Sequence, residues 1–237
     1  MNWAIRVGQI ETAHDMLSKV EAQGVFDRSS ISEKNQVEWL LARARLALAS
    51  GKYDETIVLI RQISSEDLYE KYWFAIDLVM AEVLIASGKA KEALGVIETN
   101  RWSVTSEDEP DDSAEKKLFY LWFRGVALEQ LGNSAEAAEN IEEAWRVSTA
   151  QFGEWHPLTA KIGYAYFLSA LNSDSLRAFE SSSLEMARKH LDTLIAAYPE
   201  EHPVISAASS IAKELEKKPE NIDKKHLLKL RQKAPFL

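Results

Sequence analysis

The stretch that most constrains the fold is residues 118–144, LFYLWFRGVALEQLGNSAEAAENIEEA. Apolar and small residues recur there at spacings of three and four in two short runs, which predicts two amphipathic helices. The runs are separated at Gly132, which accepts the positive φ that ends a helix, and Asn133 can cap the helix that follows. Gly125 in the first run and Ala137 in the second share the expected contact face. We therefore expect the two helices to fold closely against each other.

The same helix–turn–helix plan recurs along the chain. Comparable units are predicted at residues 37–63, 74–100 and 157–194, and a unit with a shortened first helix is predicted at the start. No sustained two-residue alternation of apolar and polar residues occurs, so the sequence predicts an all-α protein. The predicted turn residues, separated by 43, 37, 44 and 40 positions, are Gly8, Gly51, Gly88, Gly132 and Asn172.

The units resemble the tetratricopeptide repeat, whose pattern is W-x2-L-G-x2-Y followed by A-x3-F. Residues 118–144 carry this pattern as Leu121-x2-Arg124-Gly125-x2-Leu128 and Ala137-x3-Ile141. Two positions depart from it, because Thr56 replaces a small alanine and Asp77 replaces a large apolar residue. The uneven spacing and the run Gly-Glu-Trp-His-Pro at 153–157 resemble the kinesin-light-chain-like subclass. The resemblance implies a right-handed α-solenoid of stacked antiparallel helix pairs.

Residues 1–203 are assigned to this repeat array and residues 204–237 to capping helices with a basic tail. From Lys213 onward the chain has eight Lys or Arg and four Asp or Glu, a net charge of +4 in a chain of net charge −9. We expect the tail to cap the array by burying Leu227, Leu228 and Leu230, although a basic helix can also contact a membrane surface or nucleic acid. Residues 173–183 are predicted to form a loop or a short extra helix, and residues 99–112 a loop.

The composition suits a folded cytoplasmic protein. The absence of cysteine excludes disulfides, thiolate metal ligands and a cysteine nucleophile. The longest apolar run is far shorter than the roughly 20 residues of a membrane helix, and residues 1–15 lack the features of a signal peptide. The acidic balance argues against general affinity for nucleic acid through this domain.

No pattern of catalytic residues is found. The sequence lacks a phosphate-binding loop, the G-x-S-x-G and H-E-x-x-H motifs, and any pair of histidines at metal-ligand spacing on one helix face. His156 and His202 precede prolines and are expected to cap or pack at helix starts. The carboxylates of residues 107–112 are expected to form a solvated loop, with weak calcium binding as the alternative. We expect no cofactor, no metal and no enzymatic activity.

The resemblance also implies a partner-binding surface, because first helices line the concave face of such arrays. Trp122 is expected to anchor an extended or helical peptide there, with Arg45 and Glu82 beside the apolar centre. The lysine and asparagine that clamp a peptide carboxylate in this family are missing at the corresponding positions. Trp39, Trp73, Trp102, Trp145 and Trp155 are expected to pack in the core or between repeats. The predicted partner-binding residues are Glu38, Leu41, Arg45, Leu78, Glu82, Phe119, Trp122, Val126, Ile162 and Tyr166.

The sequence therefore predicts a non-catalytic scaffold that binds a protein or peptide. The alternative is the regulatory or sensing domain of a larger bacterial regulator whose DNA-binding or effector domain lies upstream of Met1. The short first unit motivates that alternative. An enzyme that uses the acidic residues is a third and weaker hypothesis. The sequence gives no prediction of oligomeric state.

Overall fold

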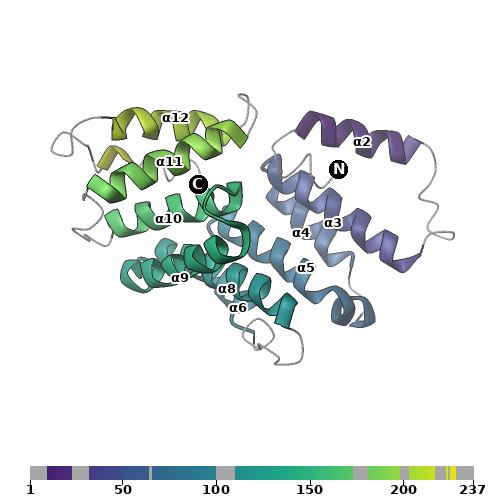
Figure 1. Cartoon of the computed structure of the whole chain (residues 1–237). Coiled ribbons are helices and arrows are strands. Elements are labelled where there is room, and N and C mark those ends of the chain that lie inside the picture. The colour runs from purple at the N-terminus through teal and green to yellow at the C-terminus, as the bar shows by residue number, and fades with distance from the viewer. Residues whose placement is uncertain are drawn as a thin grey trace. The chain divides into compact units, whose positions relative to one another are not determined.

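In the computed structural model, the described residues are 10–22, 32–63, 66–99, 110–172, 181–197, 203–216, 223 and 225–227. Every regular element in these ranges is a helix, and each of these helices packs against a described helix next to it in chain order, so the predicted all-α class is confirmed (Figure 1). The chain divides into two compact units, Met1–Lys89 and Ala90–Leu237. This division falls inside the predicted helix pair 74–100. The predicted boundary at residue 203, between the repeat array and the capping helices, stays a prediction.

The first unit contains four described helices. α3 pairs with α4 across a tight turn, and α5 packs against both (Figure 1). α2 covers another side of α3, where Ala13, Leu17 and Leu46 form a small core with Trp39. Residues 1–9, which carry the predicted short first helix and the Gly8 turn, lie outside the described residues. The helices are α2 (Ile10–Ala22), α3 (Glu33–Ala49), α4 (Tyr53–Arg61) and α5 (Glu66–Ala86).

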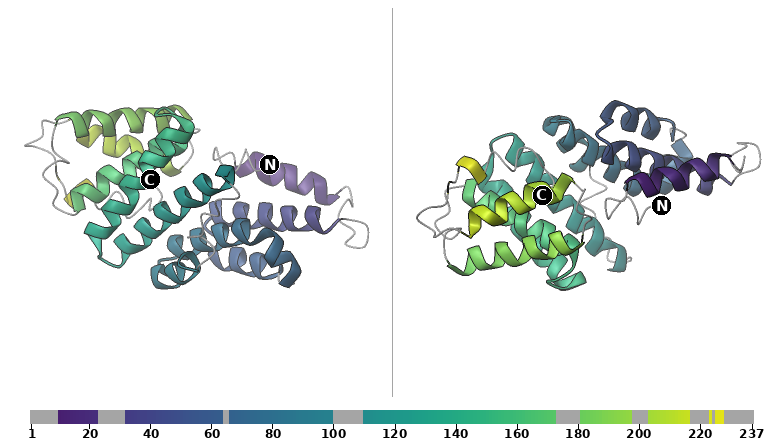
Figure 2. Two further views of the ribbon diagram at one scale, coloured as in Figure 1. Left: turned by 60° about the horizontal axis from the view of Figure 1, so that its bottom comes forward. Right: turned by 90° about the horizontal axis from the view of Figure 1, so that it is seen from above.

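The second unit is a succession in which each helix packs on the next in chain order. Figure 2 shows this succession, coloured teal through yellow, from two further directions. One core of this unit joins α10, α11 and α12 through fully buried residues such as Tyr164, Leu191 and Ile211. The helices are α6 (Ala90–Ile97), α8 (Pro110–Gln130), α9 (Ser134–Phe152), α10 (Pro157–Asn172), α11 (Ser181–Ala197) and α12 (Pro203–Leu215).

Three of the predicted turn glycines end a helix in the left-handed conformation. φ is +72° at Gly51, +76° at Gly88 and +86° at Gly132. At the first turn the N–H of Gly51 donates to Leu48 O at 2.9 Å, and the N–H of Lys52 donates to Ala47 O at 2.9 Å. The other two turns repeat this pair of hydrogen bonds. The bonds satisfy carbonyl groups at the end of the helix and form a tight turn.

The predicted close contact between α8 and α9 is confirmed at Gly125. A Cβ atom at this position would lie 2.5 Å from Ile141 Cγ1 and 3.1 Å from the backbone oxygen of Ala137. Glycine therefore allows the two helix backbones to approach at this point, because any side chain would push them apart.

The two departures from the repeat pattern are accommodated by hydrogen bonds. Thr56 is buried, and its hydroxyl donates to Lys52 O at 2.9 Å and to Ala44 O at 3.4 Å. Asp77 is also buried, and its two carboxylate oxygens accept from the Tyr69 hydroxyl at 2.9 and 3.1 Å. A polar group can replace an apolar one in the interior when it is paired in this way.

Helix lengths differ from the predicted units at several ends. α8 begins at Pro110, so the last residues of the predicted loop 99–112 are helical, and proline suits a first helical position because its missing N–H would be unpaired there. α9 continues to Phe152, well beyond Ala144. Ser181 starts α11, whereas residues 173–180 of the predicted insert lie outside the described residues.

The described part of the tail packs on the last helices, and capping by the whole tail stays a prediction. Leu227 is fully buried in the core of α10, α11 and α12. The guanidinium of Arg188 on α11 donates to Leu215 O at the end of α12, and the carboxylate of Glu214 accepts from the N–H of Asp223 at 2.9 Å. Leu228 and Leu230 lie outside the described residues.

Candidate partner-binding surfaces

In the first unit, the predicted partner-binding residues lie on α3 and α5, two helices that pack directly against each other. Glu38 is exposed, and Arg45, Leu78 and Glu82 are half-buried. Leu41 is only 5% exposed and belongs to the interior. This pair of helices therefore combines an accessible apolar side chain with side chains of both charges, but without the apolar centre expected at Leu41.

In the second unit, the predicted residues lie on α8 and α10, and most of them are covered. Phe119 and Tyr166 are half-buried, whereas Trp122, Val126 and Ile162 are buried. The Trp122 side chain is 4% exposed and packs against the Phe123 ring at 5.2 Å between centroids.

Trp122 is thus not the open groove anchor that the sequence predicted. Lys161 on α10 also packs its Nζ 5.4 Å from the centre of the indole ring. The same correction applies to Leu41, Val126 and Ile162, which are covered in the structure. Partner contact at Glu38, Arg45, Leu78, Glu82, Phe119 and Tyr166 stays a prediction.

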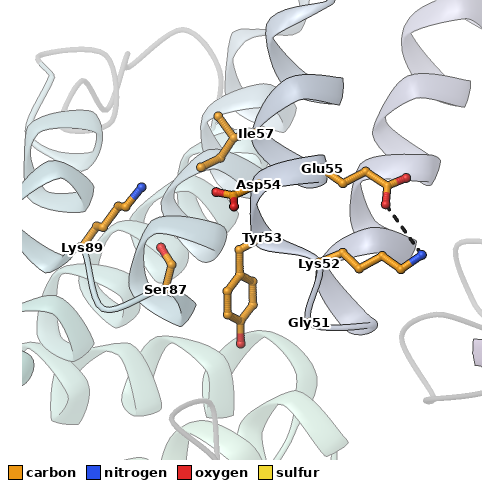
Figure 3. Close-up of a pocket in the computed structure, with 8 residues that line it drawn as sticks. All are labelled: Gly51, Lys52, Tyr53, Asp54, Glu55, Ile57, Ser87 and Lys89. Carbon is orange, nitrogen blue, oxygen red and sulfur yellow. Dashed lines mark ion pairs between the residues drawn. The ribbon is translucent and has the colours of Figure 1, made fainter.

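A shallow depression of about 430 Å³ lies in the first unit beside the Gly51 and Gly88 turns. Figure 3 shows the Tyr53 side chain between the turns, with Lys52 and Glu55 on one side and Ser87 and Lys89 on the other. Lys52 and Glu55 form an ion pair of 3.7 Å, and both are exposed. The side chains that line the depression carry opposite charges and face open solvent. They therefore do not form a group of catalytic side chains directed at one reacting atom.

His190 is the most unusual titratable group among the described residues. It is fully buried, and neither ring nitrogen has a hydrogen-bond partner there. The ring lies edge-on to Trp145, 6.0 Å between centroids, and closely fills the space beside Gly163, where α9, α10 and α11 meet. Burial lowers the pKa of His190, and the negative charge of Glu154 only partly opposes this effect. A closed, apolar site of this kind suits packing better than proton transfer.

The prediction for His156, that it caps or packs at a helix start, is confirmed. His156 Nδ1 accepts a hydrogen bond of 3.2 Å from the N–H of Leu158, so the side chain caps the start of α10. His202 and residues 107–109 lie outside the described residues. Within the described ranges, no group of three or more His, Asp or Glu side chains could hold a metal ion. None of the helices described is both long enough and apolar enough to cross a membrane.

The structure brings two large aromatic side chains to the surface where α9 connects to α10. Phe152 is 38% exposed and Trp155 is 59% exposed, so the prediction that Trp155 packs in the core or between repeats was wrong. Both residues flank Gly153, whose φ of +85° ends α9. The glycine and Pro157 were the available signals, because residues between a helix stop and a helix start often lie on the surface.

Comparison with family models, curated proteins and solved structures found no match to this chain. The resemblance to tetratricopeptide repeats therefore depends on the residues quoted above and on the helix pairs and turns that carry them.

Proposed function

We propose that this chain is a non-catalytic scaffold that binds a protein or peptide segment, and that its helix pairs form a right-handed solenoid of tetratricopeptide-like repeats. The proposal is supported by the repeated glycine turns and by the close approach of α8 and α9 at Gly125. Binding requires no covalent chemistry. Recognition comes from burying apolar side chains and from a few well-placed charges.

The observation that carries this proposal is the direct packing of α3 against α5. Together the two helices offer the half-buried Leu78 with Arg45 and Glu82. An extended or helical segment with an apolar anchor and a charged neighbour fits such a surface. Because Arg45 and Glu82 carry opposite charges, they favour one orientation of the bound segment as well as adding to its affinity.

The proposal is tested with the full chain as bait in an extract of its native source, followed by affinity measurement with each purified partner. Leu78→Ala should weaken binding by about 1–3 kcal/mol if Leu78 contacts an anchor, and Arg45→Glu should weaken it through charge reversal. Val58→Ala is the matched control, because Val58 is an exposed apolar residue on α4. Unchanged affinity in both Leu78→Ala and Arg45→Glu would remove the α3–α5 face from the binding site.

The alternative, a regulatory domain with an upstream effector, depends on residues 1–9. Those residues lie outside the described residues, and nothing in the described helices favours that alternative over a scaffold.

A further inference from the structure

The connection between α9 and α10 carries an exposed aromatic surface that the scaffold proposal does not use. We define the aromatic connection as residues 152–156, Phe-Gly-Glu-Trp-His. Its Trp155 has the largest exposed fraction of any large hydrophobic side chain described, 59%. Phe152 is exposed three positions earlier. Buried aromatic side chains are the usual source of binding energy in interfaces, and exposing two together leaves that energy available to a partner.

The aromatic connection is held in one conformation by its own contacts. The His156 ring stacks on Phe152, with 4.9 Å between centroids and 26° between planes. The same ring accepts from the N–H of Leu158 at 3.2 Å, and the N–H of His156 donates to Gly153 O at 3.4 Å. A partner therefore meets an ordered backbone and an ordered Phe152 ring next to Trp155, which lowers the free energy lost in ordering this connection.

The charge beside the aromatic side chains is negative. Glu154 is exposed and directly precedes Trp155 in the chain. A cation over an indole face is attracted by the ring quadrupole, and a neighbouring carboxylate adds a charge-assisted hydrogen bond. A chain of net charge −9 also attracts basic partners at long range. An anionic membrane would instead be repelled by the same carboxylate.

We propose that the aromatic connection docks a basic segment of a partner protein, with an arginine side chain stacked on Trp155 and paired with Glu154. This surface belongs to the second unit and does not depend on the proposed α3–α5 surface.

The test titrates the full chain with a short capped glycine–serine peptide that contains two arginines. Its comparison peptide carries citrulline, which keeps the shape of arginine and removes the charge. The readout is the indole N–H resonance of Trp155, assigned by its loss in Trp155→Phe. We expect a saturable shift with the arginine peptide and at least about tenfold weaker binding of the citrulline peptide. Raising the salt from about 20 to about 300 mM should weaken the arginine complex.

Matched variants distinguish specific binding at this site from non-specific binding. Glu154→Gln, followed by the Trp155 resonance, and Trp155→Ala, which lacks that resonance and is titrated by calorimetry beside the parent chain, should each weaken binding at least about threefold. Leu131→Ala and Glu139→Gln, which alter an exposed apolar residue and an exposed acid elsewhere in the second unit, should leave the affinity unchanged. All four should keep the far-ultraviolet circular dichroism of the parent chain.

Four results would overturn the proposal. Equal affinity for the citrulline peptide would show an apolar site without charge recognition. Equal losses in the control variants would show non-specific binding. A Trp155-dependent association with phosphatidylcholine–phosphatidylserine vesicles would assign the surface to a membrane. A shift of the Trp155 resonance with protein concentration alone would assign it to a second copy of this chain.

Discussion

Two glycines inside helices differ in what surrounds them. A Cβ atom on Gly125 would lie 2.5 Å from Ile141 Cγ1, whereas one on Gly95 in α6 would meet no atom within 4 Å. Gly125→Ala should therefore lower the free energy of unfolding by about 1–3 kcal/mol, because α8 and α9 must separate. Gly95→Ala should raise it by up to about 1 kcal/mol, because alanine is the better helix former.

Chemical denaturation of both variants beside the parent chain measures this difference. The pair is matched, since each variant adds one methyl group to a helical glycine of the second unit. An unchanged or raised stability for Gly125→Ala would contradict the observed register of α8 on α9.

Because His190 is buried, we expect the folded chain to lose stability at acidic pH. Its pKa in the folded chain is lowered from the usual 6.5 by burial, with the charge of Glu154 opposing. As the pH falls below about 6.5, the unfolded chain binds this proton before the folded chain does, so the free energy of unfolding falls. Above that pH the contribution of the neutral ring is fully present.

This expectation is checked by denaturation at a series of pH values and by the ring resonances of His190. In His190→Leu the free energy of unfolding should depend less on pH below about pH 6.5, because the titrating group is gone. A His190 ring that titrates at its ordinary pKa would contradict the proposed cause.

Among the elements, α6, α8 and α9 are joined by one guanidinium. Arg124 on α8 pairs with Glu136 on α9 at 2.6 Å, hydrogen-bonds Asn140 at 3.2 Å, and also pairs with Glu98, just after α6, at 3.0 Å. Burial opposes the charge of Arg124, but hydrogen bonds to Glu136 and Glu98 outweigh it and raise the pKa above its usual value. The side chain is 20% exposed, so solvent screens the pairs only in part.

Arg124→Gln should accordingly cost about 1 kcal/mol of stability, and the loss should shrink at high salt. Arg146→Gln is the comparison, because Arg146 pairs with Glu142 within α9 and its side chain is 66% exposed. That variant should cost about 0.5 kcal/mol or less. Denaturation at low and high salt distinguishes the two, and equal losses would mean that Arg124 does not hold three helices together.

One apolar side chain of the tail packs into the core at the end of the second unit. Leu227 is fully buried against α10, α11 and α12. Leu227→Ala should destabilise this end by about 2 kcal/mol and raise amide hydrogen exchange in α12 first. Leu131→Ala, at an exposed leucine, should leave the exchange of α12 unchanged. Unaltered exchange in Leu227→Ala would mean that the tail does not cap this end.

For the whole molecule, the division into Met1–Lys89 and Ala90–Leu237 predicts separate local stabilities. Within each unit the described helices contact mainly their neighbours in the chain, so a perturbation should weaken with distance along the chain. Gly125→Ala should raise hydrogen exchange in α8 and α9 while α3 and α4 keep the exchange of the parent chain. A uniform rise over both units, measured by mass spectrometry, would show a single cooperative unit instead.

The sequence alone determined the helices and the turns between them. Residue spacing fixes the phase of a helix, and glycine at positions 51, 88 and 132 is nearly the only residue that accepts the observed φ without strain. The contact of Gly125 with the helix after the turn followed from the same local rules. These features depend on neighbours close in the chain, so one sequence is enough to predict them.

The tertiary structure alone decided which faces remain open. Trp122 and Trp155 are the same residue type, yet the first is buried and the second exposed. The helical phase predicts the direction in which Trp122 points. It does not predict that the Lys161 side chain from α10 covers part of the indole ring. Likewise the burial of His190 arises where α9, α10 and α11 meet at Gly163. Exposure is set by atoms brought from distant parts of the chain, and local spacing does not contain that information.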